Sequence, residues 1–360
     1  MAGVGKPTGA FGGPRVTAIV GVTFALAALV SSVARAPPPG SLDGARAPAS
    51  CLGVGLREGT WTRDASACVA GSTDRDAPAA GCDDRETLGA FWSFDAASAR
   101  CGARAQTRDA NAFAGRAVLV VGDSIARHVY ASVLRLAALD PEAQSLNSQE
   151  KHRDWTHALV DGGVATFRWA PFARNVTATL GDVFDSVPHD STRTWEVVIL
   201  GAALWDALHV RSVETYARDV RALAAKLAAT RNDEFYAERF LKFFWLAAPR
   251  VRDDALIDPA KRTHMTDAKV AAYGDAARNT PGFLFEGKND DEHQWQVLPV
   301  DVGALAAGCA KAAGEDENDE SDALKKKCFG EDGVHAARAV YDAAAQVIAD
   351  AVVRETNDST

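Results

Sequence analysis

The chain has 360 residues, of which 47% are hydrophobic and 24% are charged, and its formal net charge is −9. This length and composition suit one large domain of roughly 250–300 residues with a sizeable core. The acidic balance, and the lack of a basic stripe interleaved with aromatic residues, exclude nucleic acid as an expected partner.

The first apolar run, residues 16–34, contains no charged residue. At about 1.5 Å per residue it is just long enough to span a hydrocarbon layer of about 30 Å. It predicts a transmembrane signal anchor, with residues 1–15 as a cytosolic tail, residues 35–50 as a stalk and the rest of the chain lumenal. A cleaved signal peptide with a secreted product, a transit peptide and a buried globular helix stay open as alternatives.

Six cysteines and two glycosylation sequons fit a lumenal setting. An even number of cysteines is compatible with three disulfides in an oxidising compartment, although free buried thiols remain an alternative. No Cys/His spacing suggests a metal site. The sequons begin at Asn175 and Asn357. The cysteines are Cys51, Cys68, Cys82, Cys101, Cys309 and Cys328.

Two regions of different character follow the stalk. Residues 51–116 hold four cysteines, Trp61, Trp92 and many turn-forming residues, so we expect a loop-rich N-terminal subregion. In residues 117–355, short apolar runs alternate with helical patterns, which predicts an α/β domain with a mostly parallel sheet covered on both faces. The expected strands are 117–121, 164–169, 196–200 and 243–247, and the expected helices are 124–139, 212–229, with Ser212 as N-cap, and 336–353.

Several polar stretches are interpreted as structural. The acidic run 315–322 predicts a solvated loop, which a bridge between Cys309 and Cys328 would close. Asp290, Asp291, Glu292 and His293 are consecutive, so they cannot all face one metal ion, and we expect a polar loop. His152 and His157 show no partner pattern and are assigned no site.

One serine sits where an expected strand ends and a helix begins. Gly122-Asp123-Ser124 follows the run 117–121 directly, and ligands of parallel sheets gather at the carboxyl ends of the strands. Ser124 is either the N-cap of this helix or a nucleophile. A nucleophilic serine needs a base within hydrogen-bond reach and a carboxylate that orients the base.

The far end of the chain offers such a pair. Asp332 precedes His335 by three residues, and a bend at Gly333 can fold the carboxylate back onto the ring Nδ1. The pair enters the last expected helix, which must pack on the sheet and can bring His335 to the edge that carries Ser124. Each half alone is common in proteins, but together they predict a Ser-His-Asp site.

These motifs give the chain a family resemblance. Gly122-Asp123-Ser124 with Asp332-Gly333-Val334-His335 resembles the SGNH (GDSL) hydrolase superfamily and, within its PC-esterase group, the lumenal domain of Cas1p-type sialic-acid and capsule-glycan O-acetyltransferases. The trichome-birefringence-like polysaccharide O-acetyltransferases are nearby. The stretches that carry the resemblance are VVGDSIARHVYASV, FRWAPF, VVILGAALWDAL, FWLAAPRV, MTDAKVAAYGDAA and DGVH.

The resemblance implies a fold, a setting and residue roles. The fold would be an SGNH-like three-layer α/β/α sandwich, on a single-pass type II protein of the Golgi membrane. Ser124 would take the acetyl group, His335 would act as base and then acid, and Asp332 would orient His335. Acetyl-CoA or another acetyl donor would be the co-substrate, with no bound cofactor, and a glycan would be the acceptor.

The chain also departs from the family pattern. The usual oxyanion-hole Asn is not evident, and Trp205 stands nearby; Trp205 stacks on a sugar or packs in the core. Arg127 is a second oxyanion donor, a ligand for an acidic sugar or a salt-bridged surface residue. The Ser124 backbone N–H remains a suitable oxyanion donor at a helix N-terminus. The long multi-span region of Cas1p-type proteins has no counterpart here, which suggests a membrane partner that supplies the acetyl donor.

Three functions are therefore compared. The first is a glycan O-acetyltransferase that works through an acyl-serine intermediate. The second is a carbohydrate or lipid esterase with the same triad and water as the acceptor. The third is a membrane-tethered glycan-binding protein without activity. The presence of all three triad residue types favours the two enzymes over the binding protein.

Overall fold

The computed structural model describes residues 60–63, 92–95, 110–140, 152–187, 194–209, 212–237, 242–284, 297–313 and 328–358, which fall in one compact unit of the chain. The expected cytosolic tail, anchor and stalk, the first four cysteines and the polar stretches at 290–293 and 315–322 lie outside these residues. Within them, no helix combines the length and the apolar character that crossing a membrane requires.

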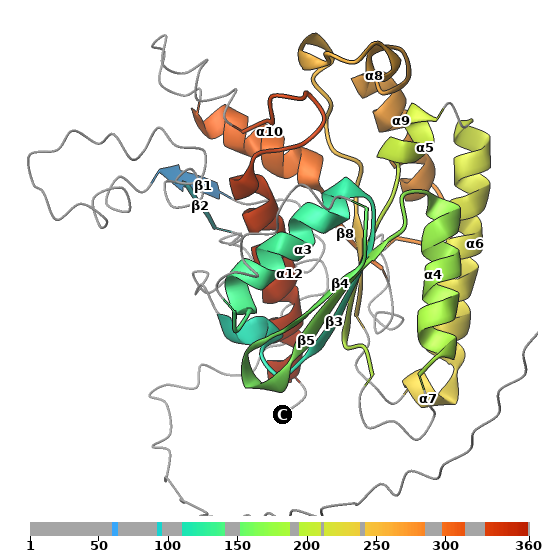
Figure 1. Cartoon of the computed structure of the whole chain (residues 1–360), viewed down its shortest axis with the longest axis vertical. Helices are drawn as coiled ribbons and strands as arrows, with labels where there is room; N and C mark the ends of the chain where they lie inside the picture. Colours follow the sequence, from blue (N-terminus) through green and yellow to red (C-terminus); the bar gives the residue numbers. More distant parts are fainter. Residues whose placement is uncertain are drawn as a thin grey trace, which may run out of the picture. The chain divides into compact units, whose positions relative to one another are not determined.

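A six-stranded, mostly parallel sheet forms the centre of the structure, in the order β4-β5-β3-β6-β7-β8 (Figure 1). Only the β4–β5 pair is antiparallel. The four expected strands are confirmed; β4 and β8 were not anticipated, because four and three residues are too few to show a period. The strands are β3 (Ala117–Gly122), β4 (Trp155–Ala158), β5 (Val164–Trp169), β6 (Val197–Gly201), β7 (Lys242–Leu246) and β8 (Leu298–Val300). A separate antiparallel pair consists of β1 (Thr60–Arg63) and β2 (Trp92–Asp95).

Helices cover both faces of this sheet, as expected for three layers (Figure 1). On one side α3 packs on α12 and α12 packs on α10, and on the other side α6 packs on α4 and α9. The side chain of Ser212 caps α6 by accepting the Thr215 N–H, as its sequence predicted. The helices are α3 (Ser124–Ala137), α4 (Ala173–Asp185), α5 (Leu204–Leu208), α6 (Val213–Asn232), α7 (Glu234–Ala237), α8 (Pro259–His264), α9 (Asp267–Arg278), α10 (Val302–Ala313) and α12 (Arg338–Asp358).

The contact between α3 and α12 joins the two ends of the main domain. The apolar side chains Ile125, Val129 and Val133 of α3 are buried in the core. Its polar face turns towards α12, where the Arg135 Nε donates to Asp342 Oδ1 at 2.9 Å. Both side chains are largely buried, and the charge-assisted hydrogen bond between them helps to hold the two helices in one relative position.

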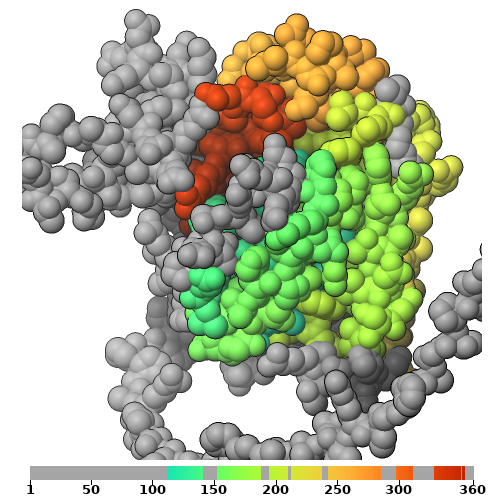
Figure 2. Space-filling model, viewed as in Figure 1, coloured from blue at the N-terminus to red at the C-terminus, as the bar shows by residue number. Residues whose placement is uncertain are grey.

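A disulfide and a backbone contact secure the segment that leads into α12. Cys309 of α10 and Cys328 are bridged, with Cα atoms 5.9 Å apart, which confirms the bridge proposed around the acidic run. The Arg252 N–H donates to the Gly333 carbonyl at 2.7 Å. In Figure 2 the orange-red surface of the residues after 297 accordingly lies against the orange surface of α8 and α9.

Gly122, the last residue of β3, is packed too closely to accept a side chain. A Cβ atom there would lie 2.3 Å from the Gly201 carbonyl oxygen and 2.7 Å from the Ala126 Cβ. We therefore expect Gly122→Ala to lower the free energy of unfolding by about 3 kcal/mol, measured by urea denaturation.

Gly181, inside α4, is the matched control for this substitution. The nearest atom to an added Cβ there belongs to Lys226, at 3.9 Å, which is an ordinary contact. Gly181→Ala should raise stability by up to about 1 kcal/mol, because alanine favours a helix. Equal urea midpoints for Gly122→Ala and the parent chain would contradict the close packing at the end of β3.

Candidate active site

Ser124 is the first residue of α3 and does not cap it. The N-cap is Asp123, whose Oδ1 accepts the Ile125 N–H at 2.9 Å. The hydroxyl of Ser124 instead lies 2.8 Å from Nε2 of His335, a residue 211 positions away. Of the two roles that the sequence left open for Ser124, the N-cap is therefore wrong.

The three residues predicted from the two motifs form one hydrogen-bonded chain. His335 Nε2 contacts the Ser124 hydroxyl, and His335 Nδ1 lies 2.6 Å from Asp332 Oδ2. An ionised carboxylate only accepts hydrogen bonds, so Asp332 places the ring proton on Nδ1. The lone pair of Nε2 is then directed at the Ser124 hydroxyl.

The loop that carries His335 and Asp332 is held by its own backbone. Asp332 Oδ1 accepts the N–H groups of Val334 and His335, both at 3.0 Å. Gly333 has a φ of +72°, and an added Cβ would lie 2.7 Å from the Arg252 carbonyl oxygen. Glycine is the residue that tolerates this left-handed conformation and this close approach, which confirms the bend expected at Gly333.

The same bonds keep the Asp332 carboxylate charged. Burial by itself would raise the pKa of Asp332, but the hydrogen bond from His335, the positive charge of that ring when protonated and the two backbone N–H groups outweigh it. The pKa of Asp332 therefore lies well below its ordinary value. An anionic partner stabilises the imidazolium that forms when His335 takes a proton.

His128 and Tyr341 pack around His335. The sequence analysis assigned neither residue a role. The His128 ring stacks on Tyr341, with centroids 4.8 Å apart, and meets the His335 ring edge-on at 5.0 Å. The Tyr341 hydroxyl accepts the N–H of Ala336, the residue after His335, at 3.0 Å. The sequence could have indicated a role for His128, because it follows Ser124 by four residues, about one helical turn, and so lies on the same face of α3.

His128 stays uncharged beside the site. Burial first, and then the nearby positive charges of His335 and Arg127, lower the pKa of His128 well below its ordinary value. A neutral imidazole can pack against His335 without repelling it when His335 becomes protonated.

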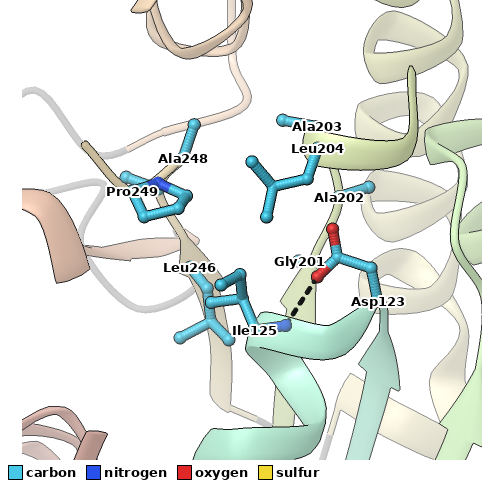
Figure 3. A pocket seen from close by; sticks show the side chains of 10 residues that line it. Asp123, Ile125, Gly201, Ala202, Ala203, Leu204, Leu246, Ala248 and Pro249 are labelled. Carbon is cyan, nitrogen blue, oxygen red and sulfur yellow. Dashed lines mark hydrogen bonds between the residues drawn. The ribbon is translucent and has the colours of Figure 1, made fainter. Parts of the chain in front are cut away.

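Asp123 faces a small cavity at the carboxyl ends of β6 and β7 (Figure 3). Residues 201–204 and 246–249 line the cavity with mostly apolar groups, and its volume of about 10 Å³ is close to the minimum for one water molecule. Burial raises the pKa of Asp123 to about 6, although the Ile125 N–H and the charge of His335 oppose the rise.

Arg127 lies one turn beyond Ser124 and is half-buried. Burial lowers the pKa of its guanidinium, while Tyr341 and Asp123 act in the opposite direction. The Asp123 side chain accepts the hydrogen bond from the Ile125 N–H, and the Asp123 carbonyl accepts that from the Arg127 N–H. The N–H of Ser124 itself has no acceptor among the described residues. This N–H at the positive end of α3 is suited to bind an oxyanion.

The other predicted residues belong to α5, α4 and α12. Trp205 is half-buried in α5, and its ring lies 5.7 Å from that of Trp169, which packs against the core. Asn175 is half-buried in the first turn of α4, and Asn357 belongs to the last turn of α12. Among the described residues, no three His, Cys, Asp or Glu side chains are grouped to hold a metal ion.

Comparisons with known proteins give one distant relative. No family model matches the chain. Protein ALTERED XYLOGLUCAN 9 from Arabidopsis thaliana is 25% identical over 260 residues, covering 68% of this chain and 62% of that protein. The chain thus spans less than two thirds of the length of this relative.

Two solved structures overlap loosely with the chain. LAE5, an α/β hydrolase from the metagenome of Lake Arreo in Spain, shares 17% identity at a TM-score of 0.34, over 68% of this chain and 96% of LAE5. A putative GDSL-like lipase from Parabacteroides merdae shares 14% identity at a TM-score of 0.37, over 67% and 97% of the two chains.

The geometry of the site supports one kind of chemistry. A serine, an imidazole and a carboxylate joined by hydrogen bonds form the arrangement that activates a serine hydroxyl as a nucleophile. The likeness to Cas1p-type enzymes stays a prediction.

The raised pKa of Asp123 predicts how stability depends on pH. Asp123→Asn keeps an oxygen at the N-cap and removes the buried charge. Above about pH 6 the buried charge of Asp123 destabilises the folded wild-type protein. As the pH falls from about 6 towards 3.8, the folded state takes up a proton at Asp123 before the unfolded state does, and the free energy of unfolding rises. We expect the stability advantage of Asp123→Asn to shrink by about 2 kcal/mol between about pH 8 and pH 4.

Urea denaturation of both proteins across this pH range measures that difference. Asp123→Ser also removes the charge and keeps a capping oxygen, so it should show the same trend. A difference between wild type and both variants that does not change with pH would show that the Asp123 carboxylate is not desolvated.

Proposed function

We propose that the chain is an O-acetyltransferase that carries an acetyl group on Ser124 and passes it to a hydroxyl of a glycan. The observation that supports this most is the hydrogen-bonded chain from Ser124 through His335 to Asp332. It supplies a nucleophile, a base and an orienting anion within bonding distance of one another.

In the first half-reaction the Ser124 hydroxyl attacks the carbonyl carbon of the acetyl donor. His335 Nε2 takes the Oγ proton as the new C–O bond forms, and the carbonyl oxygen becomes an oxyanion beside the Ser124 N–H. The bond to the leaving group then breaks, and His335 Nε2–H returns the proton to that group. Acetyl-Ser124 and the protonated leaving group are the products.

In the second half-reaction an acceptor hydroxyl takes the place of the leaving group. It gives its proton to His335 Nε2 while its oxygen attacks the acyl carbonyl carbon. The bond between this carbon and Ser124 Oγ breaks, and Oγ recovers a proton from His335. Asp332 stays ionised throughout because its pKa is held low. Water in place of the sugar hydroxyl would give hydrolysis by the same steps.

The proposal includes a donor, an acceptor and a setting. The donor is acetyl-CoA or another acetyl carrier, handed over by a membrane partner, and residues 16–34 anchor the chain in the Golgi membrane. The Cys309–Cys328 disulfide supports a lumenal site, because such bonds persist in oxidising compartments. The name of the Arabidopsis relative refers to xyloglucan, which supports a polysaccharide as acceptor.

Covalent labelling tests the nucleophile. We expect a fluorophosphonate probe to label the wild-type chain at Ser124 and to leave Ser124→Ala unlabelled, read by mass spectrometry of the peptide. Ser212→Ala is the matched control, because Ser212 also lies at a helix N-terminus but only caps it. Labelling of the Ser124→Ala protein at the wild-type rate would overturn the proposed role.

Product analysis separates transfer from hydrolysis. The wild-type protein is incubated with acetyl-CoA, or with p-nitrophenyl acetate, in the presence and absence of xyloglucan oligosaccharides. The proposal expects acetylated oligosaccharide that depends on Ser124. Free acetate as the sole product, at the same rate with and without acceptor, would instead identify an esterase.

A further inference from the structure

Four ring side chains gather around Trp205, and we call these five residues together the ring cluster. Trp169, Phe172 and Trp205 are half-buried, whereas His152 and His209 are exposed. The ring of Trp205 contacts all four others, with centroid distances from 5.2 to 6.2 Å. Aromatic side chains that gather at partly exposed positions in this way are a common mark of a binding site.

The ring cluster lies at the sheet edge that carries Ser124. Trp169 ends β5 and is the register partner of Gly122, two residues before Ser124. The Ala170 N–H also donates to the Gly122 carbonyl, at 2.9 Å. Trp205 follows the end of β6, the other neighbour of β3. The strand order therefore places Trp169 and Trp205 after the two strands that flank β3, at the same carboxyl edge of the sheet as Ser124.

A buried carboxylate fixes the geometry of the ring cluster. Asp206, next to Trp205, is fully buried, and its Oδ2 accepts the N–H of Ala173, the first residue of α4, at 2.9 Å. This bond ties α5 to the start of α4 and so holds Trp205 against Phe172. A surface that is ordered before its ligand arrives loses less entropy on binding.

We infer that the ring cluster binds the sugar rings of the acyl acceptor, an inference that rests on the proposed function. The C–H groups on one face of a pyranose are slightly positive and pack on the negative faces of aromatic rings. The imidazoles of His152 and His209 and the indole N–H groups can meet the hydroxyls around that ring. A lipid chain would be matched by apolar surface alone, without two exposed imidazoles.

Binding to the catalytically blocked protein tests the inference without relying on turnover. Titration calorimetry is carried out on Ser124→Ala with xyloglucan oligosaccharides as the probe. We expect Trp205→Ala and His209→Ala, each added to Ser124→Ala, to weaken the affinity by about tenfold, as the loss of one packed ring predicts. Trp205→Phe keeps a ring and should recover part of this loss.

Two controls separate binding from folding. His209 is exposed, so His209→Ala tests the cluster even where Trp205→Ala fails to fold. Trp195→Phe, added to Ser124→Ala, should bind like the Ser124→Ala parent. Trp195 lies before the start of β6, and its buried Nε1 has no hydrogen-bond partner among the described residues. Thermal unfolding of every variant verifies that it is folded.

The outcomes distinguish this inference from the proposed function. Unchanged affinity in folded Trp205→Ala and His209→Ala proteins, or no oligosaccharide binding by the parent, would overturn the role of the ring cluster. Fluorophosphonate labelling of wild-type Ser124 would still stand in that case. Conversely, oligosaccharide binding that depends on Trp205 and His209, in a chain whose Ser124 is never labelled, would support the cluster and refute the acetyltransferase.

Discussion

The packing of α12 on α3 is the constraint on which the site depends. Ser124 begins α3 and His335 precedes α12, so the relative position of these helices sets the distance between hydroxyl and imidazole. The Arg135–Asp342 pair and the stack of His128 on Tyr341 both cross this contact. A shift of either helix by one ångström would break a 2.8 Å hydrogen bond, because such bonds weaken steeply with distance and angle.

The short loop from Asp332 to His335 positions two members of the triad at the start of α12. Asp332 uses one carboxylate oxygen to hold the backbone of Val334 and His335, and the other to hold the His335 ring. The carboxylate therefore orders the loop and fixes the tautomer together. Because one carboxylate makes all three hydrogen bonds, Asp332 and His335 can lie only three positions apart in the sequence. The backbone must then turn at Gly333, which has a positive φ.

The sequence predicts the parts of this structure that follow from strong local patterns. The apolar runs of β3, β5, β6 and β7 predicted these strands. The sequence also predicted the N-cap at Ser212 and the contact between Ser124 and His335. The cap of α3 was missed, because Asp123 and Ser124 are both good N-cap residues and only the backbone conformation distinguishes them. The support from His128 and Tyr341 and the ring cluster around His152 and Trp205 depend on tertiary packing between distant segments, which no local period reveals.

The central claim is that Ser124 and His335 act as one unit, and the coupling between their substitutions tests it most directly. Turnover of an acetyl ester is measured for Ser124→Ala, His335→Ala and the double variant. Groups that share one proton transfer lose function together, so each single change should lower kcat by at least about 10³-fold and the double variant by no more than the worse single one. Losses that multiply in the double variant, or a His335→Ala protein that turns over at the wild-type rate, would contradict the account.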